Sequence, residues 1–514
     1  MAGAMRPEPL WVVAAGAAAA SALAAAAAWA RLGVLTAYPG PVGVDGYWYA
    51  IQLRSLLEHG RTADATLPAA LWFLLPFAAA LGPIAGLKLG AAIGVALHTL
   101  TAFALGRVLA RSTAAGLVAA AVVATSPASI YLTTEFVKQG IALAAVAGFL
   151  AALAAARERR DATVRGRRGR VALAAVTGIA AALAHKLAFA VALAALGAVL
   201  FDQARRRRGD DRRWLVALAI ALSVAVLFLA FTRSRWLGLL GATPDFSLPA
   251  LRFPSGVALR FGHETAAGAA VALVLVGLQL AAHGRRAGPL DDSPIAWSLV
   301  ALALFTAVPW LATGDPDGIG FRLRISAQLA LAPLAGLLLV AVVTERRRAA
   351  AAAVAVVVGL LVVRPLAREE GVVRPNPALV DAARRAAAAL PAGADIVTPD
   401  RQVAFLMSWE SRRPARTRPQ DGALDGATWR VLPRAWVDRE TAAALNQLAT
   451  GPATGPATGP IQLGVLYLVP ETSYRAMLAR LAPAARARWD QWDRSGALPA
   501  PGPARYHGPP GDEP

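Results

Sequence analysis

The 514-residue sequence contains no cysteine, which excludes disulfides, thiolate metal sites and cysteine nucleophiles. Charged residues make up only 16% of the chain, which is too few for the surface of an ordinary soluble protein of this length. No glycine-rich loop with phosphate-binding spacing is present, because the glycine-rich stretches fall in apolar runs or irregular turns. The sequence therefore gives no sign of a nucleotide site.

Lysine is also scarce, since only three of the 52 basic residues are lysines. Lys88, Lys138 and Lys186 all lie within or at the rim of long apolar segments. A basic group at membrane depth is costly and usually faces an aqueous cavity or an anionic partner. The lysines thus indicate a site for a negatively charged group, although each of them can equally extend along apolar surface to reach the membrane interface.

Apolar residues are abundant, at 57% of the chain. Many of them form runs about as long as the roughly 20 residues that a membrane-spanning helix needs. The net charge of +20 comes mainly from arginines in short loops between these runs, where they set the orientation of the chain in the membrane. The charge therefore indicates topology, and we expect membrane lipids and no nucleic acid as partners.

Twelve apolar segments are candidate helices of a membrane domain. They are residues 10–31, 68–83, 86–110, 113–131, 134–156, 171–185, 187–201, 214–231, 264–282, 294–312, 323–343 and 348–364. Arginine-rich loops at 157–170, 205–213, 285–286 and 346–348 are assigned to the inner side of the membrane. By alternation, the outer side receives the turns near 131–134 and 184–188, the segments 232–262 and 313–322, and everything after residue 364.

Eleven of these segments are predicted to cross the membrane. Segment 68–83 is short and contains Pro76, and the alternation of loops leaves no crossing for it, so it suits a re-entrant or interfacial helix. The first segment ends in Ala28-Trp29-Ala30, which resembles a signal-peptidase site, but its apolar run is longer than that of a typical signal peptide. We therefore expect an all-α polytopic domain of the cell membrane over residues 1–364, with an outer loop at 32–67.

On this topology, polar residues gather at the outer ends of several segments. They are Glu135, Lys138, His185, Lys186, Arg322 and Arg324. None of them belongs to the arginine-rich loops that set the topology. Charges are also tolerated at the ends of membrane spans, so the gathering either marks a binding site or follows from where charges are allowed.

The outer loop carries Asp45 shortly before the stretch YWYAIQLRSLLEHG, whose apolar spacing predicts an amphipathic helix along the membrane surface. A carboxylate at this position can cap the helix, a contribution of about 1 kcal/mol. It can also act as a general base that takes the proton from an acceptor hydroxyl. We predict that Asp45 is a base and that Tyr47 and Tyr49, in the same stretch, contact the substrate.

The order of these features resembles the GT-C superfamily of glycosyltransferases that use polyprenyl-phosphate sugars. The resemblance covers most of the chain and rests on VDGYWYAIQLRSLLEHG, LPAALWFLLPFAAALGPIAGLKLG, ALGRVLARS, ATSPASIYLTTEFVKQGIAL, ALAHKLAFAVAL and GIGFRLRISAQLALAPLAG. The chain is similar to the protein O-mannosyltransferases and lipid A aminoarabinose transferases within that superfamily. Those proteins carry an Asp-Glu pair where this chain has Asp45-Gly46.

The resemblance implies transfer of a sugar, with inversion, from a polyprenyl-phosphate donor to an acceptor hydroxyl on a glycan, lipid or protein at the outer face of the membrane. Asp45 is then the catalytic base. Lys138, Lys186, Arg322 and Arg324 neutralise the donor phosphate. Two other classes stay open, because a transporter or scramblase of polyprenyl-linked lipids shares the apolar spans and the basic residues, and a non-catalytic scaffold shares the spans.

Metal binding is a weaker expectation, and no cofactor is required by the predicted reaction. Some relatives in the superfamily use a divalent cation, and the carboxylates of Asp315 and Asp317 could supply oxygen ligands for one. The Asp-Pro-Asp-Gly sequence is also ordinary turn chemistry, which we favour. His98 lies in the middle of a predicted span, and we expect it to be a packed, hydrogen-bonded core residue.

After residue 364 the charge becomes mixed and prolines recur, which predicts a domain outside the membrane. Helical patterns at 377–390 and from 472 alternate with strand-like segments at 394–398 and 461–469, as in a small α/β domain. We place this extracytoplasmic domain at 365–497, with a linker at 449–460 inside it. The Pro/Gly-rich tail at 498–514 is predicted to be disordered.

Overall fold

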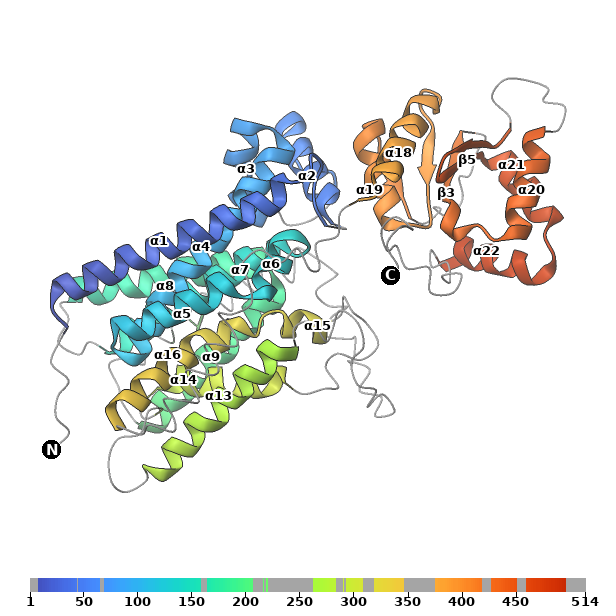
Figure 1. The fold of residues 1–514 in the computed structure, drawn as a ribbon. Helices are drawn as coiled ribbons and strands as arrows, with labels where there is room; N and C mark the ends of the chain where they lie inside the picture. The colour runs from blue at the N-terminus through green and yellow to red at the C-terminus, as the bar shows by residue number, and fades with distance from the viewer. Residues whose placement is uncertain are drawn as a thin grey trace, which may run out of the picture. The chain divides into compact units, whose positions relative to one another are not determined.

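The computed structural model describes residues 8–43, 45–64, 69–158, 164–206, 216, 219–220, 262–282, 290, 293–307, 319–345, 375–417, 427–450 and 459–495 (Figure 1). The chain divides into two compact units. The membrane unit comprises residues 1–39 and 66–372, and the C-terminal unit comprises residues 40–65 and 373–514.

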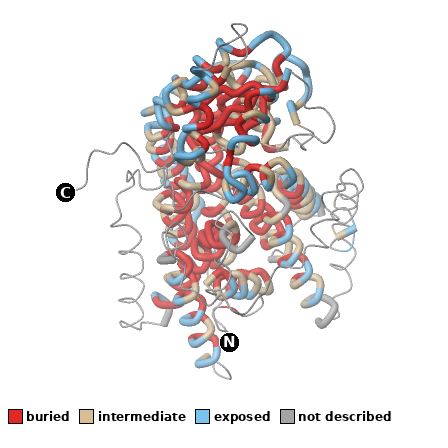
Figure 2. Tube along the Cα trace, turned by 90° about the vertical axis from the view of Figure 1, so that its right-hand side faces the viewer, coloured by how far each residue is buried: buried red, intermediate tan, exposed pale blue. Residues whose placement is uncertain are grey.

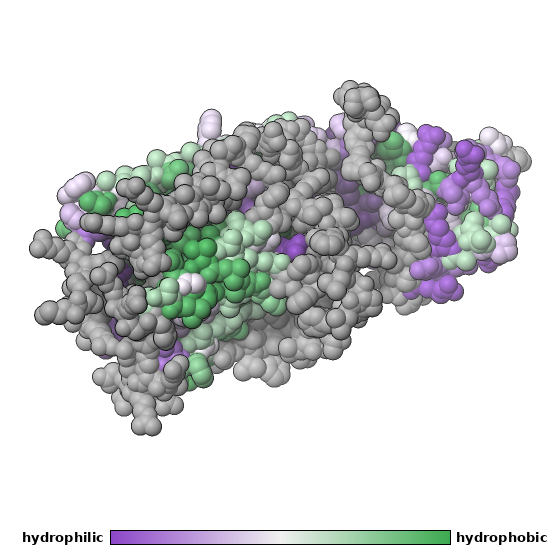
Figure 3. All heavy atoms as spheres, turned by 60° about the horizontal axis from the view of Figure 1, so that its bottom comes forward, coloured by the Kyte–Doolittle hydropathy of each residue, from purple (hydrophilic) through white to green (hydrophobic). Residues whose placement is uncertain are grey.

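The described part of the membrane unit is a bundle of helices. They are α1 (Leu10–Thr36), α3 (Ala69–Leu81), α4 (Pro83–Ala110), α5 (Thr113–Thr125), α6 (Pro127–Thr134), α7 (Val137–Glu158), α8 (Val164–Ala184), α9 (Lys186–Arg206), α13 (Gly262–Ala281), α14 (Pro294–Thr306), α15 (Ile319–Arg324) and α16 (Gln328–Glu345). Where Figure 3 draws this unit in colour, apolar side chains form a green patch on the face shown. A surface of this kind is stable in lipid and not in water.

Helix α4 is at the centre of the bundle, in contact with α1, α3, α5, α7 and α16. Small residues allow these helices to approach closely. A Cβ atom at Gly336 of α16 would lie 2.5 Å from the backbone oxygen of Ala115 in α5, and one at Gly106 of α4 would lie 2.7 Å from the Cβ of Ala119. Alanine and glycine are therefore residues that set the spacing of the bundle. The helices of this unit carry many buried residues, which are drawn red in Figure 2.

Five of the described helices are long and apolar enough to cross a membrane, or six if the bent pair α5 and α6 counts as one span. Helix α3 contains Pro76 and has 13 residues, which gives a length of about 20 Å, short of the hydrocarbon core. This length fits the re-entrant or interfacial helix predicted at 68–83. The predicted spans at 214–231 and 348–364 fall almost entirely outside the described residues, so the prediction of eleven crossings is not tested.

One predicted span is sharply bent in the structure. The span expected at 113–131 is α5 followed by α6, with a bend of 54°. Ser126 causes the break because it precedes Pro127, which disfavours a helical conformation, and because its hydroxyl caps α6 by accepting a hydrogen bond from the Ser129 N–H. The span expected at 323–343 matches the candidate span Arg322–Val343, within which turns at 325–327 separate α15 from α16.

The C-terminal unit contains a five-stranded sheet in the order β2-β1-β3-β5-β4. Its elements are α2 (Gly46–His59), α18 (Pro377–Ala389), β1 (Asp395–Val397), α19 (Arg401–Ser411), β2 (Ala415–Arg416), β3 (Thr428–Pro433), the 3₁₀ helix η3 (Arg434–Trp436), α20 (Arg439–Thr450), β4 (Ile461–Leu463), β5 (Leu466–Pro470), α21 (Glu471–Arg480) and α22 (Pro483–Ser495). Strand β1 runs parallel to β2 and β3, whereas β5 runs antiparallel to β3 and β4. The segment expected as one strand at 461–469 is a hairpin, because Gly464 has a φ of 66° and turns the chain.

Alternating side chains of the strands build a core on each face of this sheet. Ile396, Val431 and Leu468 join a core that includes α18 and α19. Their neighbours Val397, Leu432 and Val469 join the opposite core, which includes α20, α21 and α22. Tyr47 of α2 belongs to the first of these cores, so the amphipathic helix of the outer loop is packed into the C-terminal unit. The sequence pattern instead predicts this loop as part of the membrane domain.

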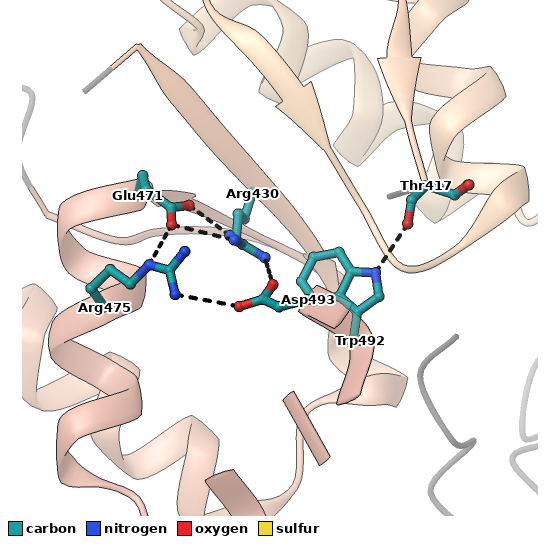
Figure 4. A network of polar contacts seen from close by, with 6 residues as sticks. All are labelled: Thr417, Arg430, Glu471, Arg475, Trp492 and Asp493. Carbon is teal, nitrogen blue, oxygen red and sulfur yellow. Dashed lines mark hydrogen bonds and ion pairs between the residues drawn. The ribbon is translucent and has the colours of Figure 1, made fainter. Parts of the chain in front are cut away.

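Arg430 on β3 is fully buried in the C-terminal unit and is held by two carboxylates (Figure 4). Its Nε donates to Glu471 at 2.7 Å and its Nη1 donates to Asp493 at 2.6 Å. Its guanidinium also lies over the ring of Tyr474, 3.7 Å from the centroid. Burial raises the pKa of Tyr474, so this phenol stays neutral. The network joins the sheet to α21 and α22.

Replacing Arg430 by Leu should destabilise the C-terminal unit by about 3 kcal/mol or more, because it leaves buried carboxylates without their main partner. Arg475 also contacts Glu471 and Asp493, but its side chain is 53% exposed. Arg475→Leu is therefore the control and should cost at most about 1 kcal/mol. Limited proteolysis of the full chain, with fragments identified by mass, should detect early cleavage within 373–495 only in the Arg430 variant. Equal protease resistance of the two variants would contradict this account.

Candidate functional site

Asp45 directly precedes α2 but does not cap it. The chain turns at Gly43, which has a φ of 89°, and Asp45 takes the N-cap position without a capping hydrogen bond from its side chain. Its Oδ1 instead lies 2.9 Å from Nη2 of Arg401, the first residue of α19. The Asp45 side chain is 19% exposed. The capping alternative considered for this residue is therefore absent from the structure, and the carboxylate is engaged with a cation.

Tyr47 and Tyr49, predicted to contact substrate, are both buried in the C-terminal unit. The Tyr47 ring packs edge-to-face against Trp409 of α19, with 6.2 Å between centroids. The Tyr49 ring packs in the same manner against Trp48 at 5.0 Å. Both rings therefore have a packing role, and the Tyr47–Trp409 contact positions α2 and the preceding Asp45 against α19.

The membrane unit brings several of the predicted site residues together where α6 ends and α7 and α15 begin. Glu135 is buried between α6 and α7, and Lys138 is half-buried in the first turn of α7. The Arg322 guanidinium of α15 lies over the ring of Phe136, 4.8 Å from its centroid. Nη1 of Arg322 is 3.5 Å from Nε2 of His185, which directly precedes α9. We call Glu135, Lys138, His185 and Arg322 the polar cluster.

Hydrogen bonds hold the α15 side of the polar cluster in place. The side-chain amide of Gln139 donates to the backbone oxygen of Arg322 and to the hydroxyl of Ser326, both at 2.7 Å. Ser326 in turn donates to the Arg322 oxygen at 2.8 Å. These bonds satisfy backbone and side-chain groups at the break between α15 and α16, so the break positions Arg322 beside α7. Arg324, two residues further on, is buried.

The three lysines differ in their surroundings. Lys88 at the start of α4 is buried, and its ammonium donates to the backbone oxygens of Tyr38 and Pro39, just after α1. Lys88 therefore has a structural role in joining α4 to α1. Lys138 belongs to the polar cluster. Lys186 begins α9, but its side chain lies outside the described residues.

A second set of buried polar residues was not predicted from the sequence. Arg31 of α1 donates to the backbone oxygens of Ala124 and Ser126 at 3.1 and 3.4 Å, and the Ser126 hydroxyl donates to Glu264 of α13 at 2.7 Å. Arg31 is 1% exposed and Glu264 is 3% exposed. Their one sequence signal is position, since each stands at the end of a predicted apolar span. The contacts fix the bend between α5 and α6.

A small cavity lies among α4, α6, α7 and α16 and was also missed. Its polar lining comes from His98, Ser129, Thr133 and Gln328. His98 was expected to be packed and hydrogen-bonded. It is buried, but its Nε2 has no hydrogen-bond partner among the described residues, and the same holds for both polar side-chain atoms of Gln328. The cavity thus offers hydrogen-bonding groups at membrane depth, next to the first turns of α7.

The structure does not test the two carboxylates considered as metal ligands. Asp315 and Asp317 lie outside the described residues. Within the part of the chain that is described, no group of three His, Asp or Glu side chains is arranged to hold a metal ion.

The predicted site residues belong to two different units. Asp45 belongs to the C-terminal unit, whereas the polar cluster and Arg324 belong to the membrane unit. Within the C-terminal unit, Asp45 pairs with Arg401 of α19. Within the membrane unit, Arg322 lies beside Phe136 and His185. Chemically, basic side chains such as Lys138 and Arg322 suit a phosphate, and a carboxylate such as Asp45 suits the acceptance of a proton.

Comparison with solved structures finds a similar fold in ArnT from Cupriavidus metallidurans. The crystal structure of that protein in the apo state has a TM-score of 0.54 and 15% sequence identity, over 88% of this chain and 97% of that chain. The structure of the same protein bound to undecaprenyl phosphate has a TM-score of 0.51 and 16% identity, over 87% and 97% of the two chains. No protein-family model and no curated protein matches the chain.

At this level of identity the likeness concerns the fold. The match covers nearly all of the ArnT chain and most of this one, so the two chains share an overall fold. The chain is accordingly a helical membrane protein of ArnT-like fold that includes a small sheet.

Proposed function

We propose that this protein is a membrane glycosyltransferase that moves a sugar from a polyprenyl-phosphate donor to an acceptor hydroxyl at the outer face of the membrane. The observation that carries the proposal is the ArnT-like fold over 88% of the chain, together with undecaprenyl phosphate in one of the ArnT structures. The polar cluster supports it, because a phosphate between apolar helices requires cations that are fixed in place.

The basic residues of the membrane unit have the donor phosphate as their proposed ligand. Lys138 and Arg322 supply charge-assisted donors, and Lys186 and Arg324 add to the positive potential. Glu135 and His185 orient these cations and the sugar. In a site with little water, one well-placed donor contributes about 3 kcal/mol to the transition state, so the basic residues also stabilise the phosphate as it leaves.

Asp45 has the role of general base. Its carboxylate accepts the proton of the acceptor hydroxyl, while the acceptor oxygen forms a bond to the anomeric carbon. The bond between that carbon and the phosphate oxygen breaks, and its electron pair leaves with the polyprenyl phosphate. Attack opposite to the leaving group inverts the anomeric configuration. The acceptor is a glycan, lipid or protein hydroxyl, and the reaction as written needs no cofactor.

Reconstitution into liposomes tests the proposal against the transporter alternative. Purified protein is given a polyprenyl-phosphate sugar labelled in the sugar, with a membrane extract as the source of acceptors. We expect labelled sugar to appear in the acceptor fraction with release of polyprenyl phosphate. Movement of intact donor between leaflets, without cleavage of the sugar-phosphate bond, would instead identify a transporter or scramblase.

The orientation of the chain in the membrane has its own test. Because the chain has no cysteine, single cysteines can be introduced at Gln447 on α20 and at Gly169 on α8, both of which are exposed. A Cβ atom at Gly169 meets nothing within 4 Å, so the substitution fits. In intact cells an impermeant thiol reagent should label the cysteine at 447 and not the one at 169. The opposite pattern would place the C-terminal unit on the inner side.

A further inference from the structure

Helices α2 and α19 of the C-terminal unit are in contact. At their N-terminal ends, Asp45 pairs with Arg401 at 2.9 Å. Near their C-terminal ends, Arg54 of α2 donates to the backbone oxygens of Trp409 and Ser408 in α19, at 3.0 and 3.1 Å. The Asp45 carboxylate thus lies at the N-terminal end of α2, where free backbone N–H groups favour a negative charge. The Arg54 guanidinium lies at backbone carbonyls near the C-terminal end of α19, which favour a positive charge.

Aromatic packing between these contacts holds the two helices together. Trp409 contacts the Tyr47 ring on one side and receives the Arg54 guanidinium over its ring, 4.5 Å from the centroid. Tyr47 is buried together with Leu406 and Met407 of α19. Burial of side chains of this size stabilises the helix pair by several kcal/mol in total. The register of α2 on α19 is therefore set without the Asp45–Arg401 pair.

The Asp45–Arg401 pair itself contributes little to stability. The Arg401 side chain is 58% exposed, and exposed ion pairs contribute little to stability because water screens them. The guanidinium nevertheless fixes the orientation of a carboxylate that makes no capping bond to its own helix. A cation that adds little stability yet orients the proposed catalytic carboxylate acts on function more than on folding.

We propose that Arg401 is a positioning residue for Asp45, so that α19 of the C-terminal unit forms part of the catalytic machinery. This inference rests on the proposed transferase function. Arg401 holds the Asp45 carboxylate in the orientation in which it accepts the proton of the acceptor hydroxyl. A displacement of about 1 Å in such a group can lower the rate of a reaction on the order of 100-fold. Loss of Arg401 thus lowers turnover and leaves donor binding intact.

The test measures sugar transfer by the purified full-length chain with a polyprenyl-phosphate sugar donor. Arg401→Met should lower kcat by about 10-fold to 100-fold and change the donor KM by less than about 2-fold. Arg401→Lys should recover part of the loss, because a cation returns without the planar geometry. The double variant Asp45→Asn with Arg401→Met should be no slower than Asp45→Asn alone, because Arg401 acts through Asp45.

Arg384→Met is the matched control. Arg384 of α18 is 66% exposed, and its Nε lies 3.6 Å from the carboxylate of Glu410 in α19. This ion pair resembles the Asp45–Arg401 pair in the exposure of its arginine and in its contact with α19. This variant should keep wild-type kinetics. If the wild-type chain transfers sugar and both Arg401 variants match it, the inference is wrong and the proposed function stands. If the wild-type chain cleaves no donor, the proposed function fails and the inference fails with it.

Discussion

Replacing Asp45 by Asn should lower sugar transfer at least about 100-fold while leaving the fold intact, because the amide cannot take the proton of the acceptor hydroxyl. The fold survives because the residue makes no capping bond and because its ion pair with Arg401 is partly exposed. Initial rates with a polyprenyl-phosphate sugar donor, at equal amounts of folded protein, give the measurement. Asp45→Glu keeps the carboxylate and should retain more activity than Asp45→Asn.

The Asp45 prediction has a control in the same segment. Glu58 lies on α2 as well, where its exposed side chain contacts His59. Glu58→Gln should transfer sugar at the wild-type rate. If Asp45→Asn remains within a few-fold of the wild type, Asp45 has no role as a base and the proposed mechanism is wrong.

Replacing Lys138 by Met should weaken use of the donor by about 1.5–3 kcal/mol, which corresponds to a 10-fold to 150-fold rise in donor KM or loss of kcat/KM. Methionine keeps much of the apolar stem and removes only the charge-assisted donor. Lys186→Met should have a similar effect. Lysine-to-arginine changes at these positions should not restore full activity, because a planar guanidinium does not occupy the place of a compact ammonium.

The matched control for Lys138 is Arg168→Met, which removes one exposed positive charge of α8 at the end assigned to the inner side. Its donor kinetics should equal those of the wild type. Lys88→Met should change donor KM less than Lys138→Met does, because the Lys88 ammonium is bound to backbone oxygens after α1. If the donor kinetics are unchanged in both the Lys138 and Lys186 variants, these lysines do not bind the donor phosphate. Arg322 and Arg324 would then bind it alone.

Much of the membrane unit follows from local sequence. The apolar runs predict α1, α4, α7 and α13 to within a few residues, because a helix in lipid must satisfy its own backbone groups. The break at Ser126-Pro127 was missed. The apolar run is continuous there, and capping by the Ser126 hydroxyl decides where α6 begins.

Contacts between distant segments explain the rest of what the sequence did not predict. The pattern of α2 indicates an amphipathic helix, and lipid was the partner expected for its apolar face. In the structure that face packs on α19, more than 300 residues away, through Tyr47 and Trp409. Neither partner carries a sequence signal of the other. The buried Arg31 and Glu264 are comparable, because each looks like a charge at the end of a span until the fold connects both to Ser126.

The most direct measurement of the central claim is the release of polyprenyl phosphate from a polyprenyl-phosphate sugar by the purified chain. The account predicts that wild-type protein releases one polyprenyl phosphate for each sugar transferred, with the opposite anomeric configuration in the product. It also predicts that Asp45→Asn releases on the order of 100-fold less in the same time. An intact donor after incubation with folded wild-type protein and acceptor would contradict the claim, and so would release at the same rate in both proteins.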